Sequence, residues 1–139
     1  MLSRFSLPGF GGKRRFDELS EKEVLALAIA SEEEDGRIYA IYAQKLRTAY
    51  PASAAVFDGM ASEEDGHRQR LLALYQQRFG GVVLPIRREH VADFYARKPV
   101  WLVENLGLDQ IRAEAEDMER QARDFYVTCL LYTSPSPRD

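Results

Sequence analysis

The sequence contains very little cysteine, with Cys129 the only one among 139 residues. A single cysteine excludes an internal disulfide framework and any zinc or iron site built from four thiolates of this chain. Long apolar runs are also lacking, because no segment reaches the roughly 20 residues that a membrane-spanning helix needs. The N-terminus does not contain the uninterrupted apolar core of a signal peptide. We therefore expect a cytoplasmic protein.

An excess of positive charge is absent too. The chain has 19 lysines and arginines against 22 acidic residues, for a net charge of −3. Its basic residues do not gather on one helical stripe, so nucleic acid is not an expected partner. The hydrophobic fraction of 45% and the charged fraction of 29% are typical of a globular protein, and the length allows one domain with one core.

Alternating patterns typical of β-strands are almost absent, apart from the short apolar piece Val82–Leu84. Apolar residues instead recur every three or four positions, which predicts helices. A first helix begins after the capping box of Ser20 and Glu23 and ends before Pro51. A second helix runs from Pro51 to Gly80-Gly81. The short connection at Pro51 predicts an antiparallel hairpin.

The segment from residue 80 to residue 106 is too long for a tight turn and too apolar for a free linker. We interpret it as a packed crossover that contains a short helix from Glu89 to Arg97. A third helix begins near Leu108, with Ile111, Ala115 and Tyr126 facing inward. Together these elements predict an all-α antiparallel helix bundle with a crossover connection.

The two ends of the chain lack this helical pattern. Residues 1–16 are rich in glycine and basic side chains and predict a flexible leader. Residues 129–139 finish in a run of serine and proline, which we interpret as a non-native tail at the end of a truncated fragment. A short natural tail is the alternative. The predicted domain therefore spans residues 17–128.

Two of the predicted helices share a pattern of residues. Glu32 precedes Tyr39 by seven positions, and Glu119 precedes Tyr126 by the same number. Each glutamate lies on the apolar stripe of its helix. The match predicts that the first and third helices are related halves of one bundle.

Carboxylates and an imidazole on these stripes predict a metal site. Glu64 and His67 are three residues apart, so they are neighbours on one face of the second helix, and Glu32 lies on the stripe of the first. A Glu-x-x-His facing a lone glutamate is half of a carboxylate-bridged di-metal site, and Glu119 begins the other half. No lysine or arginine lies on the inner stripes near these carboxylates to offset their burial. Oxygen ligands with an imidazole suit iron or manganese.

A solvated acidic face is the alternative interpretation of the same residues. Glu32–Asp35 and Glu63–Asp65 are runs of acidic side chains, and such runs commonly face water. On that interpretation the chain is a helical interaction domain without a metal. Metal stoichiometry would distinguish the two.

Three segments carry a resemblance to a known family: Leu27–Tyr39, Glu63–Arg68 and Arg97–Leu102. Together they resemble the rubrerythrin-like branch of the ferritin-like superfamily, over roughly residues 16–126. The nearest match resembles the ferritin-like domain that bacterial membrane-bound ferritins carry next to a membrane domain of the vacuolar iron transporter type. The resemblance implies two iron ions per complete site, with manganese as the alternative metal. It also implies that the intact protein is attached to a membrane through a fused transporter domain.

The resemblance also implies roles for particular residues. Glu32 would be a terminal ligand of one iron, Glu64 a bridging ligand and His67 a terminal nitrogen ligand. Glu119 would be a terminal carboxylate of the second half. Further groups would hydrogen-bond to the ligands, and these are Tyr39, Tyr126 and Asp35.

Two departures from the family pattern limit the expected function. A second Glu-x-x-His, expected on a fourth helix, is missing, and so is the cysteine-rich rubredoxin module of full rubrerythrins. A homodimer would let a partner chain supply the missing half. We expect Fe(II) binding and oxidation by O₂ or peroxide, of the non-haem di-iron ferroxidase or peroxidase type, in iron storage, detoxification or export. The alternative is a non-catalytic module that senses iron or delivers it to a membrane transporter.

Overall fold

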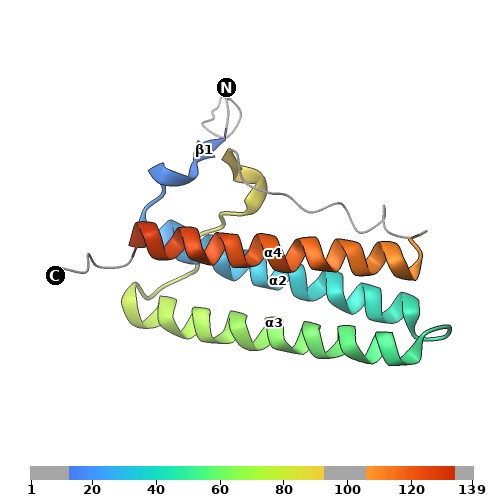
Figure 1. The fold of residues 1–139 in the computed structure, drawn as a ribbon. Coiled ribbons are helices and arrows are strands. Elements are labelled where there is room, and N and C mark those ends of the chain that lie inside the picture. Colours follow the sequence, from blue (N-terminus) through green and yellow to red (C-terminus); the bar gives the residue numbers. More distant parts are fainter. Residues whose placement is uncertain (1–12, 93–105, 134–139) are drawn as a thin grey trace, which may run out of the picture.

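The computed structural model describes residues 13–92 and 106–133, with side chains described as far as residue 128. Three long helices dominate this part of the chain: α2 (Glu21–Leu46), α3 (Pro51–Arg78) and α4 (Leu108–Thr133). They lie side by side, with α3 and α4 both antiparallel to α2 (Figure 1). The predicted all-α antiparallel bundle is therefore confirmed.

The ends of the helices follow from local chemistry. The side chain of Ser20 accepts a hydrogen bond from the Glu23 N–H at 3.1 Å, and the Glu23 carboxylate accepts one from the Ser20 N–H at 2.9 Å. This capping box satisfies two N–H groups that have no partner within α2. Pro51 begins α3, and Gly80 and Gly81, with φ of 69° and 74°, follow its C-terminus. Positive φ is a conformation that glycine adopts without steric cost.

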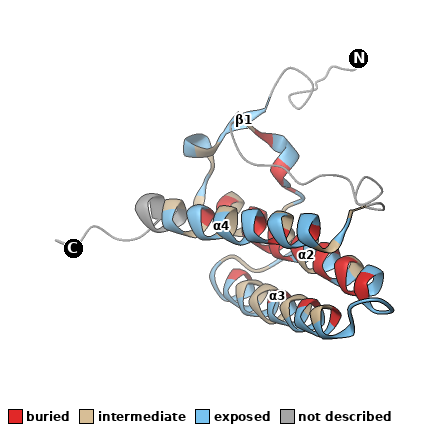
Figure 2. Ribbon diagram, turned by 45° about the vertical axis from the view of Figure 1, so that its right-hand side comes forward, coloured by how far each residue is buried: buried red, intermediate tan, exposed pale blue. Residues whose placement is uncertain are grey.

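The buried side chains form two apolar clusters, and α2 contributes to both. One cluster takes Ala26–Ile29 of α2 together with Tyr75 and Phe125. The other takes residues of α2 from Ile38 onward together with side chains of α3 and α4. Figure 2 shows the buried positions along α2. The acidic run Glu32–Asp35 of α2 falls between the stretches that this helix gives to the two clusters.

The crossover differs from the prediction. Arg88–His90 forms the short 3₁₀ helix η3, and Val91–Ala92 forms strand β2 rather than part of a helix. Strand β2 pairs in parallel with β1 (Arg14–Arg15), which comes from the end of the predicted leader. Val91 is buried in the apolar core, and a β-branched residue suits an extended backbone. The predicted helix from Glu89 to Arg97 is therefore wrong up to residue 92, and its remainder lies outside the described residues.

The residues directly after β1 form a 3₁₀ helix, η2 (Phe16–Glu18), which leads from β1 into α2. At the other end, α4 extends to Thr133, past Cys129, where the helical pattern was expected to stop. The first proline after Cys129 is Pro135, so no proline interrupts the segment before that point. No helix in the described ranges is long and apolar enough to cross a membrane.

Candidate metal centre

Three predicted ligands meet between α2 and α3. Each of Glu32, Glu64 and His67 offers one ligand atom, and these atoms all lie within 4.8 Å of one another. His67 Nδ1 is 3.0 Å from Glu64 Oε1 and 3.2 Å from Glu32 Oε2. Two carboxylate oxygens and one imidazole nitrogen thus converge on a space the size of a cation site.

The register of the two helices produces this convergence. Glu64 and His67 are separated by about one turn of α3, so their side chains lie on adjacent parts of one face. Gly36 of α2 faces them across the helix contact, where an added Cβ would lie 3.4 Å from the Cβ of Glu64. The absence of a side chain at residue 36 lets α2 approach α3 closely beside the ligands.

Both carboxylates are buried, whereas the imidazole is partly open to solvent. Glu32 is 4% exposed and Glu64 is 7% exposed. Burial, together with the charge and hydrogen bond of neighbouring Glu32, raises the pKa of Glu64 to about 9. Without a cation, Glu64 therefore carries a proton at neutral pH. A bound metal ion would replace that proton, so the donor set fits a hard or borderline divalent cation.

Two tyrosines reach across the bundle in a reciprocal pattern. The hydroxyl of Tyr126 in α4 donates to Glu32 of α2 at 2.7 Å. The hydroxyl of Tyr39 in α2 donates to Glu119 of α4 at 2.9 Å. Burial and the Glu119 carboxylate raise the pKa of Tyr39, so its hydroxyl remains a donor. The internal repeat seen in the sequence thus corresponds to matched contacts between α2 and α4.

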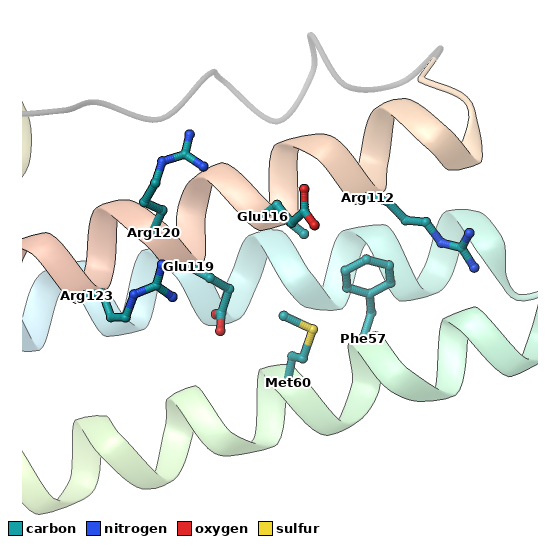
Figure 3. A pocket seen from close by; sticks show the side chains of 8 residues that line it. Phe57, Met60, Arg112, Glu116, Glu119, Arg120 and Arg123 are labelled. Atoms are coloured by element: carbon teal, nitrogen blue, oxygen red, sulfur yellow. The ribbon is translucent and has the colours of Figure 1, made fainter.

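Glu119 lies apart from the three converging ligands. It is exposed, and it does not belong to the cluster of Glu32, Glu64 and His67 in the described part of the chain. In Figure 3 it extends from α4 toward α3, beside Met60. It lines an open groove of about 630 Å³. The other side chains along this groove are Phe57, Met60, Arg112, Ala115, Glu116, Arg120 and Arg123.

Sequence reasoning missed one buried cation. Arg88 in η3 is 3% exposed, and its guanidinium lies 2.8 Å from Glu34 Oε1 and 2.9 Å from Asp35 Oδ1. In the described part of the chain, the inner stripes of the long helices carry no such cation near the ligands, whereas Arg88 comes from the crossover. An arginine between the apolar residues Ile86 and Val91 was the available signal.

The helices, together with two buried glutamates and a partly exposed histidine between α2 and α3, define a ferritin-like carboxylate bundle. The family model for rubrerythrin matches residues 23–133, which is most of the chain, and the protein belongs to that family. The match covers all three long helices and every predicted ligand. No curated protein and no solved structure matches the chain.

Proposed function

We propose that this protein binds iron in a di-iron carboxylate centre and oxidises Fe(II) with O₂ or peroxide, in the service of iron storage, detoxification or export. Manganese is the alternative metal. The observation that carries the proposal is the convergence of buried Glu32 and Glu64 with partly exposed His67. Membership of the rubrerythrin family supports the same chemistry.

Each residue of the centre has a defined task in this proposal. Glu64 would give up its proton to hold a cation through its carboxylate oxygens and would serve as the bridging ligand. Glu32 and His67 complete one half of the site, and Tyr126 fixes the orientation of the Glu32 carboxylate by its hydrogen bond. When bound, a pair of redox-active metal ions supplies the one-electron steps of Fe(II) oxidation.

The second half of the proposed di-metal centre lacks most of its ligands. Glu119 is present, but the chain holds only one Glu-x-x-His. We propose that native downstream sequence or a second copy of the chain supplies the remaining ligands beside Glu119. A fused membrane domain of the iron-transporter type belongs to the same proposal. Sedimentation of the chain with and without iron tests the homodimer.

A non-catalytic iron-sensing or delivery module is the second candidate function. It is favoured by the exposure of Glu119 in its open groove, because a half-built second site can bind a cation without completing a turnover. Such a protein would bind Fe(II) anaerobically but would not accelerate its oxidation when O₂ is admitted. Ferroxidase turnover therefore separates the two functions.

An anaerobic Fe(II) titration tests the metal site itself. The double variant Glu32→Ala/Glu64→Ala removes two buried ligands and is expected to abolish tight binding. The matched control, Glu33→Ala/Glu63→Ala, removes the exposed neighbours of the same residues and is expected to bind like the wild type. Equal binding by the wild type and the ligand double variant would show that the site is wrongly assigned.

A further inference from the structure

Arg88 forms the one buried cation–carboxylate cluster in the described chain outside the three ligands. Its side chain is 2% exposed, and the Asp35 side chain that it contacts is equally buried. The guanidinium contacts Glu34 and Asp35 and also donates to the Ser31 carbonyl at 3.1 Å. These three partners belong to one turn of α2, which is the turn that carries Glu32.

The backbone of Arg88 is held firmly in place. Ile86 and Val91, on either side of η3, are buried in the apolar cluster with Ala26–Ile29 of α2. Strand β2 also pairs with β1 immediately after η3. The backbone position of Arg88 is therefore set by apolar packing and strand pairing as well as by the contacts of its guanidinium.

The acidic run of α2 is divided among different partners. Glu32 receives the Tyr126 hydroxyl and contacts His67. Glu33 points outward and lies 3.9 Å from Arg37. Glu34 and Asp35 are both paired with Arg88. Four consecutive carboxylates thus lie beside one metal site, and three of them are paired with arginines.

Asp35 is the carboxylate that most needs such a partner. It is 1% exposed and lies three residues after Glu32 in α2, so the two side chains are neighbours on one face of the helix. A buried carboxylate without a cation would be drawn to a divalent ion nearby, since an unpaired buried charge is costly. The guanidinium occupies one of its oxygens and removes that driving force.

We propose that Arg88 is a positioning residue of the metal centre, which keeps Glu34 and Asp35 out of the ligand set and leaves Glu32 as the ligand from this run. The inference rests on the proposed metal-binding function. The guanidinium of Arg88, held in the crossover, thereby limits the number of protein ligands on a metal ion bound between α2 and α3.

The test uses Co²⁺ as the probe, because its visible absorption bands weaken and shift as its coordination number rises. Arg88→Met frees two carboxylates, and the bands of bound Co²⁺ are expected to shift and lose intensity relative to the wild type. Adding Glu34→Gln and Asp35→Asn to that variant removes both freed carboxylates and is expected to restore the wild-type spectrum. A role of Arg88 in stability alone predicts no such restoration.

Two further variants keep the test decisive. Arg37→Met removes the arginine partner of exposed Glu33 and is expected to leave the spectrum unchanged. Arg88→Lys keeps the buried charge, and hence the fold, but one ammonium group cannot match the contacts of the guanidinium, so a smaller shift in the same direction is expected. This variant decides the matter if Arg88→Met does not fold.

The outcomes separate this inference from the proposed function. If the wild type binds no Co²⁺ and no Fe(II), the metal centre itself is wrong and the role of Arg88 fails with it. If the wild type binds Co²⁺ but the Arg88 variants give its spectrum unchanged, the positioning role is wrong and the metal centre stands. A shifted Arg88→Met spectrum that Glu34→Gln and Asp35→Asn together do not restore also overturns the role.

Discussion

Among the predicted ligands, Glu64 is the one whose pKa the folded structure shifts strongly. In the unfolded chain its carboxyl has an ordinary pKa near 4.5, and in the folded chain burial and Glu32 raise that pKa to about 9. The residue type and its three-residue spacing from His67 are visible in the sequence. The protonation state depends on Glu32, which is 32 positions away and becomes a neighbour only when the hairpin forms.

The shifted pKa predicts how the stability of the metal-free protein depends on pH. Between about 4.5 and about 9 the folded chain keeps a proton on Glu64 that the unfolded chain has released. The free energy of unfolding therefore falls as pH rises through this window, by up to about 1.4 kcal/mol per pH unit from this group. Chemical denaturation of the metal-free protein across the window measures the slope.

The matched variants assign that slope to one residue. Glu64→Gln cannot titrate and is expected to lose this contribution, whereas exposed Glu63→Gln is expected to keep it. A slope that survives in Glu64→Gln would mean that another group takes up the proton.

Tyr126→Phe is a second prediction at the level of single residues. The change removes the hydroxyl that donates to Glu32 and leaves the ring in place. The Glu32 carboxylate then loses an orienting hydrogen bond, so we expect metal affinity to fall by about tenfold. Isothermal titration with Mn²⁺ measures the change.

Tyr75→Phe is the control for this prediction. Tyr75 is also buried, but its hydroxyl donates to the Val82 carbonyl at 3.3 Å and touches no ligand. Its loss is expected to reduce stability and leave Mn²⁺ affinity unchanged. Equal losses of affinity in the two variants would indicate a general loosening of the bundle rather than an effect at Glu32.

At the scale of elements, the helix boundaries were the most predictable feature. The capping box at Ser20, Pro51 at the start of α3 and the two glycines after α3 all act through the backbone of their own neighbours. Such signals need no tertiary contact. The pairing of β1 with β2 was not predictable, because each strand has two residues and their partnership joins segments more than 70 positions apart.

Ser20→Ala tests the contribution of the capping box to α2. The substitution removes the acceptor of the Glu23 N–H, and we expect the free energy of unfolding to fall by about 1 kcal/mol. Ser62→Ala, at an exposed position inside α3, is the matched control and is expected to be neutral or slightly stabilising, since alanine is the better helix former. Thermal unfolding of both variants gives the comparison. A loss as large in Ser62→Ala would exclude capping as the cause.

At the scale of the whole molecule, the bundle brings together carboxylates from α2 and α3 into a candidate metal site that the unfolded chain lacks. Metal binding should therefore stabilise the folded state. With Mn²⁺ at one hundred times its Kd, the free energy of unfolding is expected to rise by about 2.7 kcal/mol. Differential scanning calorimetry with and without the metal measures this gain.

The ligand double variant Glu32→Ala/Glu64→Ala is the control for this stabilisation. It lacks both buried carboxylates, so Mn²⁺ is expected to leave its unfolding temperature unchanged. An equal rise in the double variant would show that Mn²⁺ acts elsewhere, for example on the exposed acidic residues. The metal-free double variant is also expected to lose the pH dependence attributed to Glu64.

The sequence by itself determined the helices, their approximate ends and the residues that could serve as ligands. Periodicity and caps are local, and a Glu-x-x-His spacing is a property of one helix. The tertiary structure alone decided that Glu64 is protonated without a metal, that Tyr126 and Tyr39 cross the bundle to opposite glutamates, and that Arg88 pairs with Asp35. These features depend on desolvation and on distances between segments remote in sequence, which only the packed chain establishes.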